Sequence, residues 1–185
     1  MLVLAIDTAT PAISAALAEV GESGVRMLGE RVTVDGRAHA ERLTPQIASL
    51  LAEAGVKPRD LGALAAGVGP GPFTGLRVGL MTAATMAGTL GVPVYGVSTL
   101  DVLGAFGKGR VLAATDARRR EVYWAVYEDG VRTDLGPAVD KPSSITSLLA
   151  ERGVLSGVGE GAAKYADVLG LVPPAPQPSG PAPLA

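Results

Sequence analysis

The chain has 185 residues, of which 48% are hydrophobic and 18% charged, and its net charge is −2. These values predict a well-packed globular protein of one large or two small domains, without the broad basic surface that attracts nucleic acid or anionic membranes. The lack of cysteine excludes a disulfide framework and a thiolate metal site, and it agrees with the cytoplasmic location that we expect.

The first half of the chain alternates between strand-like and helix-like patterns. The expected elements are strands at 2–6, 12–19 and 26–34, a helix at 38–54, a strand at 61–69, a helix at 74–90 and a strand at 92–97. Gly55 is placed to follow the first helix in the C′ position. Pro45 either kinks that helix or follows Thr44 as the cap of a later start.

The helix at 74–90 follows the glycine–proline loop GVGPGPFTG, and Thr74 is its expected N-cap. Its apolar seam is predicted to contain Leu76, Leu80, Ala83, Ala87 and Leu90. The opposite face is small or uncharged, with Gly75, Gly79, Thr82, Met86 and Thr89. A helix without a charged side is buried in its own core or against a partner.

The glycine–proline loop is not a nucleotide-binding motif. No lysine follows its glycines, as a Walker loop requires, and Gly75 comes one position late for the Rossmann spacing. We therefore interpret the loop as a rigid turn that sets the helix direction, and a weak anion site at Thr74 is the alternative.

The second half repeats the order of the first. Residues 4–19 and 113–128 align without a gap, from Asp7 to Asp116, an offset of 109 residues. An extended piece near 131–135, a helix at 143–153 capped by Ser143 or Ser144, a strand at 154–159 and a helix at 161–170 are expected to follow. The repeat predicts an α/β protein of two related sheet-and-helix lobes with a cleft between them.

Two aspartates at strand ends are the main candidate site residues. Asp7 and Asp116 could hold a metal–phosphate group across the cleft, with hydroxyl groups from Thr8 and Thr10. The alternative is that each aspartate starts a turn. Gly157 and Gly159 suit the close approach of a nucleotide, or they end a strand and let a helix pack closely.

Two other features carry weaker signals. Arg118, Arg119 and Arg120 form a basic cluster after Asp116, which is either a solvated turn or a contact for an acidic partner or an RNA phosphate. His39 is the only histidine, and it fits neither a metalloprotease motif nor a catalytic triad. We expect an ordinary polar residue in the first turn of a helix.

Several motifs together resemble one family. IDTAT, HAERL-x-P, GPGPFTGLRVG, PVYGVSTLD and DARRREVYWAVY are similar to the bacterial tRNA threonylcarbamoyladenosine biosynthesis proteins TsaB, also called YeaZ. The resemblance implies an actin-like (ASKHA) fold of two duplicated ribonuclease-H-like lobes, at 1–98 and 99–172, before a proline-rich tail at 173–185. It also implies a role in forming N6-threonylcarbamoyladenosine (t6A) in tRNA.

The family resemblance implies a non-catalytic subunit. The related transferase TsaD has a histidine pair near the region equivalent to Thr99–Val102, where this chain has none. Expected partners are a TsaD-like transferase, a TsaE-like ATPase and, in isolation, a second copy of the chain. The expected interface residues lie on the two helices of the first half: Leu43, Ile47, Leu50, Leu76, Leu80, Ala83, Met86 and Leu90.

Other functions remain as alternatives at this point. No cofactor is expected to be required, although weak ATP or ADP binding in the cleft or at a complex interface is compatible with the resemblance. The main alternative is an actin-like nucleotide hydrolase or sugar kinase that uses Asp7 and Asp116. A peptidase ranks last because the sequence offers no metal cluster and no convincing nucleophile–base pair.

Overall fold

The structure, a computed structural model, describes residues 1–172. The predicted proline-rich tail at 173–185 lies outside the described residues. The chain divides into two compact units, of which the first comprises Met1–Val97 and the second begins at Ser98. No helix within residues 1–172 combines the length and the apolar character needed to cross a membrane. Each unit contains its own sheet, so the fold is α/β with two mixed sheets.

The first unit confirms the predicted order of strands and helices. Its elements are β1 (Leu2–Asp7), β2 (Ala12–Gly21), β3 (Gly24–Val34), α1 (His39–Glu53), a short 3₁₀ turn (Pro58–Asp60), β4 (Leu61–Gly67), α2 (Phe73–Leu90) and β5 (Val94–Val97). The sheet order is β3-β2-β1-β4-β5. The first three strands are antiparallel neighbours, and β4 runs parallel to both β1 and β5.

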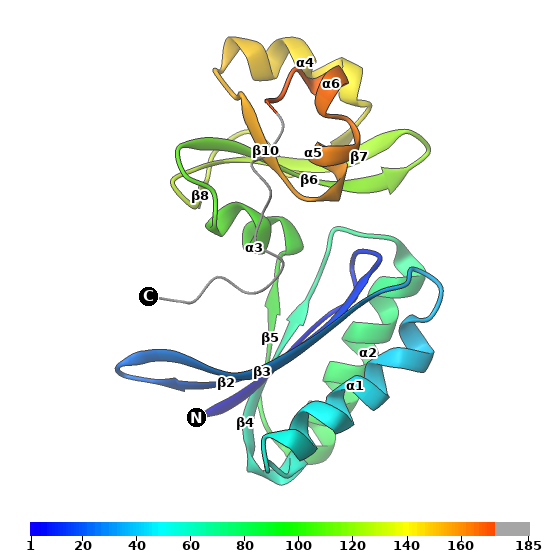
Figure 1. The fold of residues 1–185 in the computed structure, drawn as a ribbon, viewed down its shortest axis with the longest axis vertical. Helices are drawn as coiled ribbons and strands as arrows, with labels where there is room; N and C mark the ends of the chain where they lie inside the picture. The colour runs from blue at the N-terminus through cyan, green and yellow to red at the C-terminus, as the bar shows by residue number, and fades with distance from the viewer. Residues whose placement is uncertain (173–185) are drawn as a thin grey trace. The chain divides into compact units, whose positions relative to one another are not determined.

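The core of this unit lies between the sheet and its two helices. Leu4 and Ile6 on β1 are buried, and the register pairs them with buried Leu17 and Ala15 on β2. Helices α1 and α2 pack on that face of the sheet (Figure 1). Each fully buried Leu or Ile contributes on the order of 2 kcal/mol, so this layer accounts for much of the unit's stability.

The helix starts differ from two sequence predictions. Helix α1 begins at His39 and contains Pro45, so a later start capped by Thr44 is wrong. Gly55 has φ +66° directly after the C-cap, which confirms the predicted C′ glycine. Helix α2 begins at Phe73 with Pro72 in the N-cap position and no side-chain cap, so Thr74 is not the N-cap.

The buried face of α2 coincides only in part with the predicted seam, because Ala83 and Ala87 are shared whereas Gly75 and Gly79 are buried in place of the leucines. Its buried residues are Gly75, Gly79, Ala83 and Ala87, spaced four apart. Leucines of the predicted seam, such as Leu80, are only half-buried at the border of the core. The small residues let the helix backbone approach the sheet closely, and this close approach outweighs the larger apolar area of the leucines.

The second unit has a sheet with helices on both faces. Its elements are α3 (Thr99–Ala105), β6 (Arg110–Arg118), β7 (Glu121–Glu128), β8 (Val131–Arg132), β9 (Ala138–Asp140), α4 (Pro142–Glu151), β10 (Ser156–Val158), α5 (Glu160–Lys164) and α6 (Ala166–Leu169). The strand order is β10-β6-β7-β8, and β9 also pairs with β7. Alternate residues of β6 and β7 face two separate apolar clusters, one with α4 to α6 and one with α3.

Three details of the second unit correct the sequence analysis. Helix α3, capped by Ser98, was not predicted. Helix α4 starts at Pro142 behind Lys141, so neither Ser143 nor Ser144 is its cap. The expected helix at 161–170 is divided at Tyr165 into α5 and α6.

The two sheets are separate and share one pattern of pairing. Strand β1 pairs antiparallel with β2 and parallel with β4, and β6 pairs antiparallel with β7 and parallel with β10. Asp7 and Asp116 lie at corresponding places in the two patterns, at the end of β1 and near the end of β6. A single continuous sheet, which would have contradicted two lobes, is not what the structure contains.

Candidate functional site

The glycine–proline loop and the first part of α2 are packed against the turn that follows β1. A Cβ added to Gly71 would lie 1.9 Å from the carbonyl oxygen of Ala9, and one on Gly75 would lie 2.9 Å from that of Thr8. The Gly75 position also faces the His39 ring, at 3.2 Å from Nε2. Only glycine fits such contacts, which explains the glycines of the sequence motif as packing residues.

Thr8 and Thr10 have structural roles here. The Thr8 hydroxyl is buried, donates to the carbonyl oxygen of Gly75 at 2.8 Å and accepts from the amide nitrogen of Gly79 at 2.9 Å. It is therefore not free to bind phosphate, and that prediction is wrong for Thr8. The Thr10 hydroxyl accepts from the amide of Ala12 at 3.2 Å, and Nε2 of buried His39 lies 2.9 Å from the Thr10 carbonyl oxygen.

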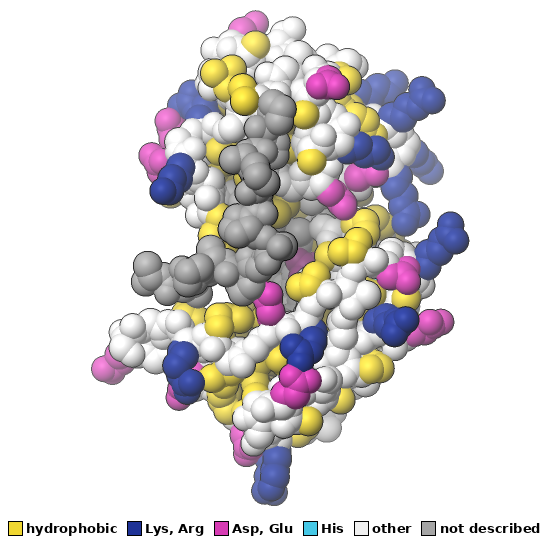
Figure 2. Space-filling view, viewed as in Figure 1, with side chains coloured by type: hydrophobic (Ala, Val, Ile, Leu, Met, Phe, Trp, Pro, Cys, Tyr) yellow, Lys and Arg dark blue, Asp and Glu magenta, His cyan; other side chains and the backbone are white. Residues whose placement is uncertain are grey.

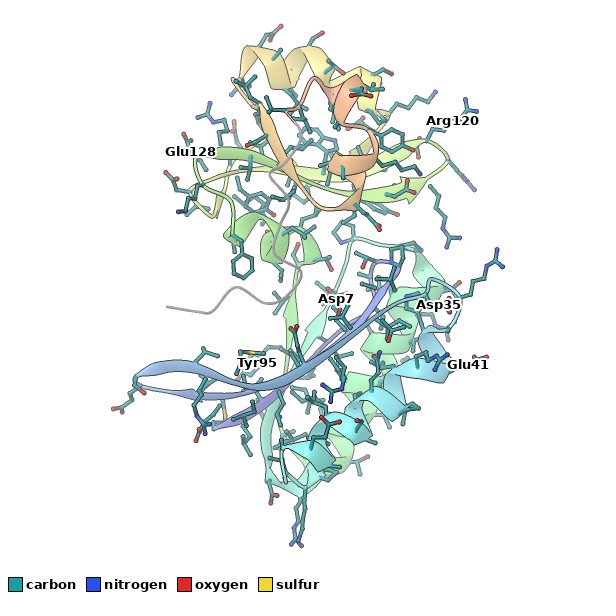
Figure 3. The ribbon with its side chains drawn as sticks, viewed as in Figure 1. Asp7, Asp35, Glu41, Tyr95, Arg120 and Glu128 are labelled. Atoms are coloured by element: carbon teal, nitrogen blue, oxygen red, sulfur yellow. The ribbon has the colours of Figure 1, made fainter. Side chains whose placement is uncertain are left out.

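Asp7 lies at the carboxyl end of parallel strands β1 and β4 (Figure 3). Its Oδ1 accepts from the amide of Ala9 at 2.7 Å, so the carboxylate does begin a turn, as the alternative interpretation predicts. A Cβ on Gly67 would lie 2.3 Å from its Cγ, so the neighbouring strand must end in glycine here. The carboxyl ends of parallel strands are common ligand sites, and phosphate binding by Asp7 stays a prediction.

Asp116 is already paired within the second unit. Its Oδ2 lies 2.7 Å from Nζ of Lys164, and its Oδ1 accepts from the amide of Arg118 at 3.2 Å. The hydrogen bond to Asp116 raises the pKa of the Lys164 ammonium, which keeps the lysine charged. The lysine thus supplies the positive charge that the sequence prediction assigns to a bound metal. Among residues 1–172, no three His, Cys, Asp or Glu side chains are grouped to hold a metal ion.

The glycines before α5 are closely packed against other parts of the second unit. A Cβ on Gly159 would lie 2.4 Å from the carbonyl oxygen of Ala114, and one on Gly157 would meet Ala162 and Leu171 at 2.8 Å. These positions are filled by the chain itself, which favours the close-packing alternative for both glycines. Nucleotide binding at Gly157 or Gly159 remains a prediction.

Half of the predicted interface residues are in the core. Leu43, Ile47, Leu50 and Ala83 are at most 5% exposed and belong to the cluster between helices and sheet. They cannot contact a partner that docks on the folded unit, so their assignment as interface residues is wrong. The helical spacing of these apolar residues was predicted correctly, but the sequence analysis placed them on the surface of the unit.

The other predicted interface residues are half-buried. Leu76, Leu80, Met86 and Leu90 have intermediate exposure, and the last three pack against the core of the first unit. They lie at the margin of any surface that α2 presents. Their role in an interface stays a prediction.

The exposed side of α2 is the candidate functional site. We call its residues the outer strip: Phe73, Arg77, Met81, Ala84 and Gly88. Phe73 is 71% exposed and Met81 58% exposed, and the Arg77 guanidinium carbon lies 5.4 Å from the centroid of the Phe73 ring. An open hollow of about 350 Å³ is lined by Phe73, Thr74, Arg77, Val78 and Met81.

The outer strip has the spacing of a helix–helix contact. Its members follow one another by four, four, three and four positions, and Arg77 is the only charged residue in α2. An exposed helix face without acidic residues is unusual for a protein surface, which makes the outer strip a candidate interaction site. The spacing was visible in the sequence, but the leucines at 76, 80 and 90 gave a stronger apolar signal.

Comparisons with known proteins agree on one family. The family model TsaD, tRNA N6-adenosine threonylcarbamoyltransferase, matches residues 30–174. A Mycobacterium tuberculosis protein described as uncharacterized is 51% identical over 96% of this chain and 82% of its own length. Escherichia coli TsaB, a tRNA threonylcarbamoyladenosine biosynthesis protein, is 43% identical over 69% of this chain and 55% of its own length.

A solved structure extends the match to the fold. YeaZ from Pseudomonas aeruginosa superposes with a TM-score of 0.74 and 34% identity, covering 93% of this chain and 81% of that one. The chain therefore belongs to the TsaD family that the family model describes. Within that family its relatives are the TsaB (YeaZ) proteins, and the predicted resemblance to them is confirmed.

Proposed function

We propose that this protein is a non-catalytic partner subunit in t6A biosynthesis, and that it activates a TsaD-type transferase by binding it. The proposal is carried by the outer strip of α2, which is exposed and contains only one charged residue, Arg77, in a chain that is similar to TsaB (YeaZ) proteins. This chain matches 55% of the length of E. coli TsaB, the tRNA threonylcarbamoyladenosine biosynthesis protein. The function of the whole protein is therefore part of the proposal.

The assignment as non-catalytic is supported by how the polar groups are used. Asp101, in the segment where the transferase is expected to have its histidine pair, accepts from the Tyr127 hydroxyl at 2.6 Å and lies 3.0 Å from Nη1 of Arg132. His39 contacts the Thr10 carbonyl oxygen inside the first unit. These side chains serve the fold, which leaves the chemistry to the partner.

The outer strip offers an energetically reasonable contact. Burying large, exposed apolar side chains such as Phe73 and Met81 stabilises an interface by roughly 25 cal/mol per Å² of apolar surface. Arg77 can remain stacked on Phe73 while it pairs with an acidic group of the partner. A stable interface buries about 800 Å² on each side, so the strip forms its centre and neighbouring residues of α1 and α2 form its rim.

The remaining expectations enter the proposal as secondary points. A second copy of the chain and a TsaE-like ATPase are further proposed partners, and weak ATP or ADP binding is proposed without a required cofactor. The actin-like fold of two duplicated ribonuclease-H-like lobes is supported by the common pairing order of the two sheets. A cytoplasmic location is part of the same proposal.

The direct test is reconstitution with the TsaD-type protein from the same organism. We expect the two purified proteins to elute together in gel filtration, and tRNA modification to require both. Separate elution together with full activity of the transferase alone would contradict the proposal. Modification of tRNA by this chain alone would contradict its non-catalytic part.

A further inference from the structure

The hairpin between β6 and β7 has an unusual tip. Its turn residues are Arg119 and Arg120, and the register shifts between Asp116 and Arg118 before the strands pair through Arg118 and Glu121. The three arginines have φ values of +62°, +48° and +65°. Tight hairpin turns and bulges with this backbone conformation normally contain glycine, asparagine or aspartate, because other side chains crowd the backbone.

The neighbouring hairpin of the same sheet has a turn sequence that is common in this backbone conformation. Strands β7 and β8 pair through Glu128 and Val131, and the turn between them is Asp129-Gly130, with φ +48° and +81°. Aspartate–glycine is one of the preferred pairs for such a turn. The chain thus contains a preferred turn sequence at one hairpin and three strained arginines at the next. Because arginine is unfavourable in this backbone conformation, the geometry of the turn does not account for the three arginines.

The three guanidinium groups are available for an external ligand. All three residues are exposed, and none of the ion pairs among residues 1–172 includes them. The nearby carboxylate of Asp116 is taken by Lys164. Figure 2 shows Lys and Arg side chains gathered on the side where this hairpin runs in Figure 1, and Arg120 extends away from the ribbon in Figure 3.

We propose that the β6–β7 tip, Arg118 to Arg120, binds phosphate groups of an RNA backbone. A guanidinium presents paired N–H donors that match phosphate oxygens, and its charge persists at every physiological pH. Contacts of this kind position a nucleic acid without reading its sequence. With a net charge of −2, the chain confines this attraction to a local contact. The choice of RNA over an acidic protein rests on the proposed function in tRNA modification.

The test uses a variant that leaves the turn intact. The double substitution Arg119→Asn with Arg120→Gly removes two charges and installs a preferred turn pair, so it folds at least as well as the original. The matched control is Lys108→Asn with Arg152→Asn. It removes two exposed charges at the other end of β6, where the Arg152 carbonyl oxygen accepts from Arg110. Binding of the full chain to fluorescently labelled tRNA is measured by anisotropy at several salt concentrations.

We expect wild-type protein to bind tRNA at about 50 mM salt, and the hairpin variant to bind roughly tenfold more weakly, with the control unchanged. The slope of log K against log salt should become shallower by about 0.7 to 0.9 for each phosphate group that the variant no longer neutralises.

Absent wild-type binding, or equal binding by the hairpin variant, would overturn the proposal. An equal loss of binding to a poly-glutamate peptide would assign the tip to an acidic protein and overturn the RNA assignment. The assay contains no transferase, so its failure leaves the proposed partnership unaffected.

Discussion

The hydroxyl oxygen of Thr8 lies 2.9 Å from the amide nitrogen of Gly79 and 2.8 Å from the carbonyl oxygen of Gly75. These two backbone groups are four residues apart, which is the spacing that pairs directly in a regular α-helix. The Thr8 side chain, in the turn after β1, therefore bonds to the carbonyl oxygen and the amide nitrogen of one such pair in α2. The first strand and the second helix are locked together at this point, and the outer strip is held on the opposite side of the helix.

Thr8→Val tests this lock. Valine keeps the shape of threonine but removes both hydrogen bonds in a buried position, so we expect the free energy of unfolding to fall by about 1 to 2 kcal/mol. Thr8→Ser keeps the hydroxyl and should cost less. Urea denaturation of the three proteins measures the difference, and equal losses for valine and serine would show that the hydroxyl bonds do not matter.

Gly79→Ala and Gly88→Ala should have opposite effects in the same helix. A Cβ at Gly79 would lie 2.5 Å from the Thr8 hydroxyl oxygen, whereas one at Gly88 would meet nothing within 4 Å. We expect the first change to destabilise by roughly 1 to 3 kcal/mol and the second to stabilise by up to about 1 kcal/mol. Thermal unfolding followed by circular dichroism distinguishes them, and a stabilising Gly79→Ala would contradict the packing described here.

The strained turn at the β6–β7 tip makes a prediction about stability that is independent of ligand binding. Arg119→Asn with Arg120→Gly should raise the free energy of unfolding by roughly 1 kcal/mol, because the positive φ values then carry little cost. Lys108→Asn with Arg152→Asn, which changes the net charge equally, should not. A hairpin variant less stable than the wild type in urea would argue against strain at these residues.

Glu160 predicts a pH dependence of stability. Partial desolvation of its carboxyl group is the main cause that raises its pKa above the usual 4.5 in the folded chain, so the folded state holds the proton more tightly than the unfolded state. Stability contributed by this group is therefore present below about pH 4 and declines as the pH rises through the folded pKa. Glu160→Gln should raise the urea midpoint at pH 7 relative to wild type, with a smaller gain at about pH 4. The same gain at both pH values would exclude ionisation as its cause.

The order of the elements in the first unit could be predicted because it depends on local periodicity. Strands β1 and β2 alternate between buried and half-buried residues, and α1 carries an apolar stripe that ends at Gly55. The alignment of Asp7 with Asp116 predicted a second pair of strands around Asp116, and β6 and β7 form an antiparallel pair there. These signals lie within single segments of sequence.

The orientation of α2 could be predicted only in part, through Ala83 and Ala87. Its glycines carry no hydrophobic signal, and their burial depends on contacts with Thr8 and Ala9, far away in the sequence. A helix rich in leucine and alanine offers two candidate faces, and only the close approach of the β1–β2 turn decides between them. Leu43 and Ile47 of α1 were assigned to an interface because the family resemblance implies a helical contact with a partner, although these residues fill the core.

The proposed docking on the outer strip is tested most directly by Met81→Glu. Met81 is 58% exposed and does not belong to the core cluster, so the change places a charge on the outer strip while the unit stays folded. Leu80 is less suitable because it packs against the core. The control is Val131→Glu, at a position 70% exposed in the second unit.

Complex formation with the TsaD-type transferase is measured by calorimetry, after circular dichroism has verified the fold of both variants. We predict that Met81→Glu weakens binding at least about a hundredfold, as expected for a central interface residue, and that Val131→Glu binds like wild type. Wild-type affinity of a folded Met81→Glu protein would contradict the account.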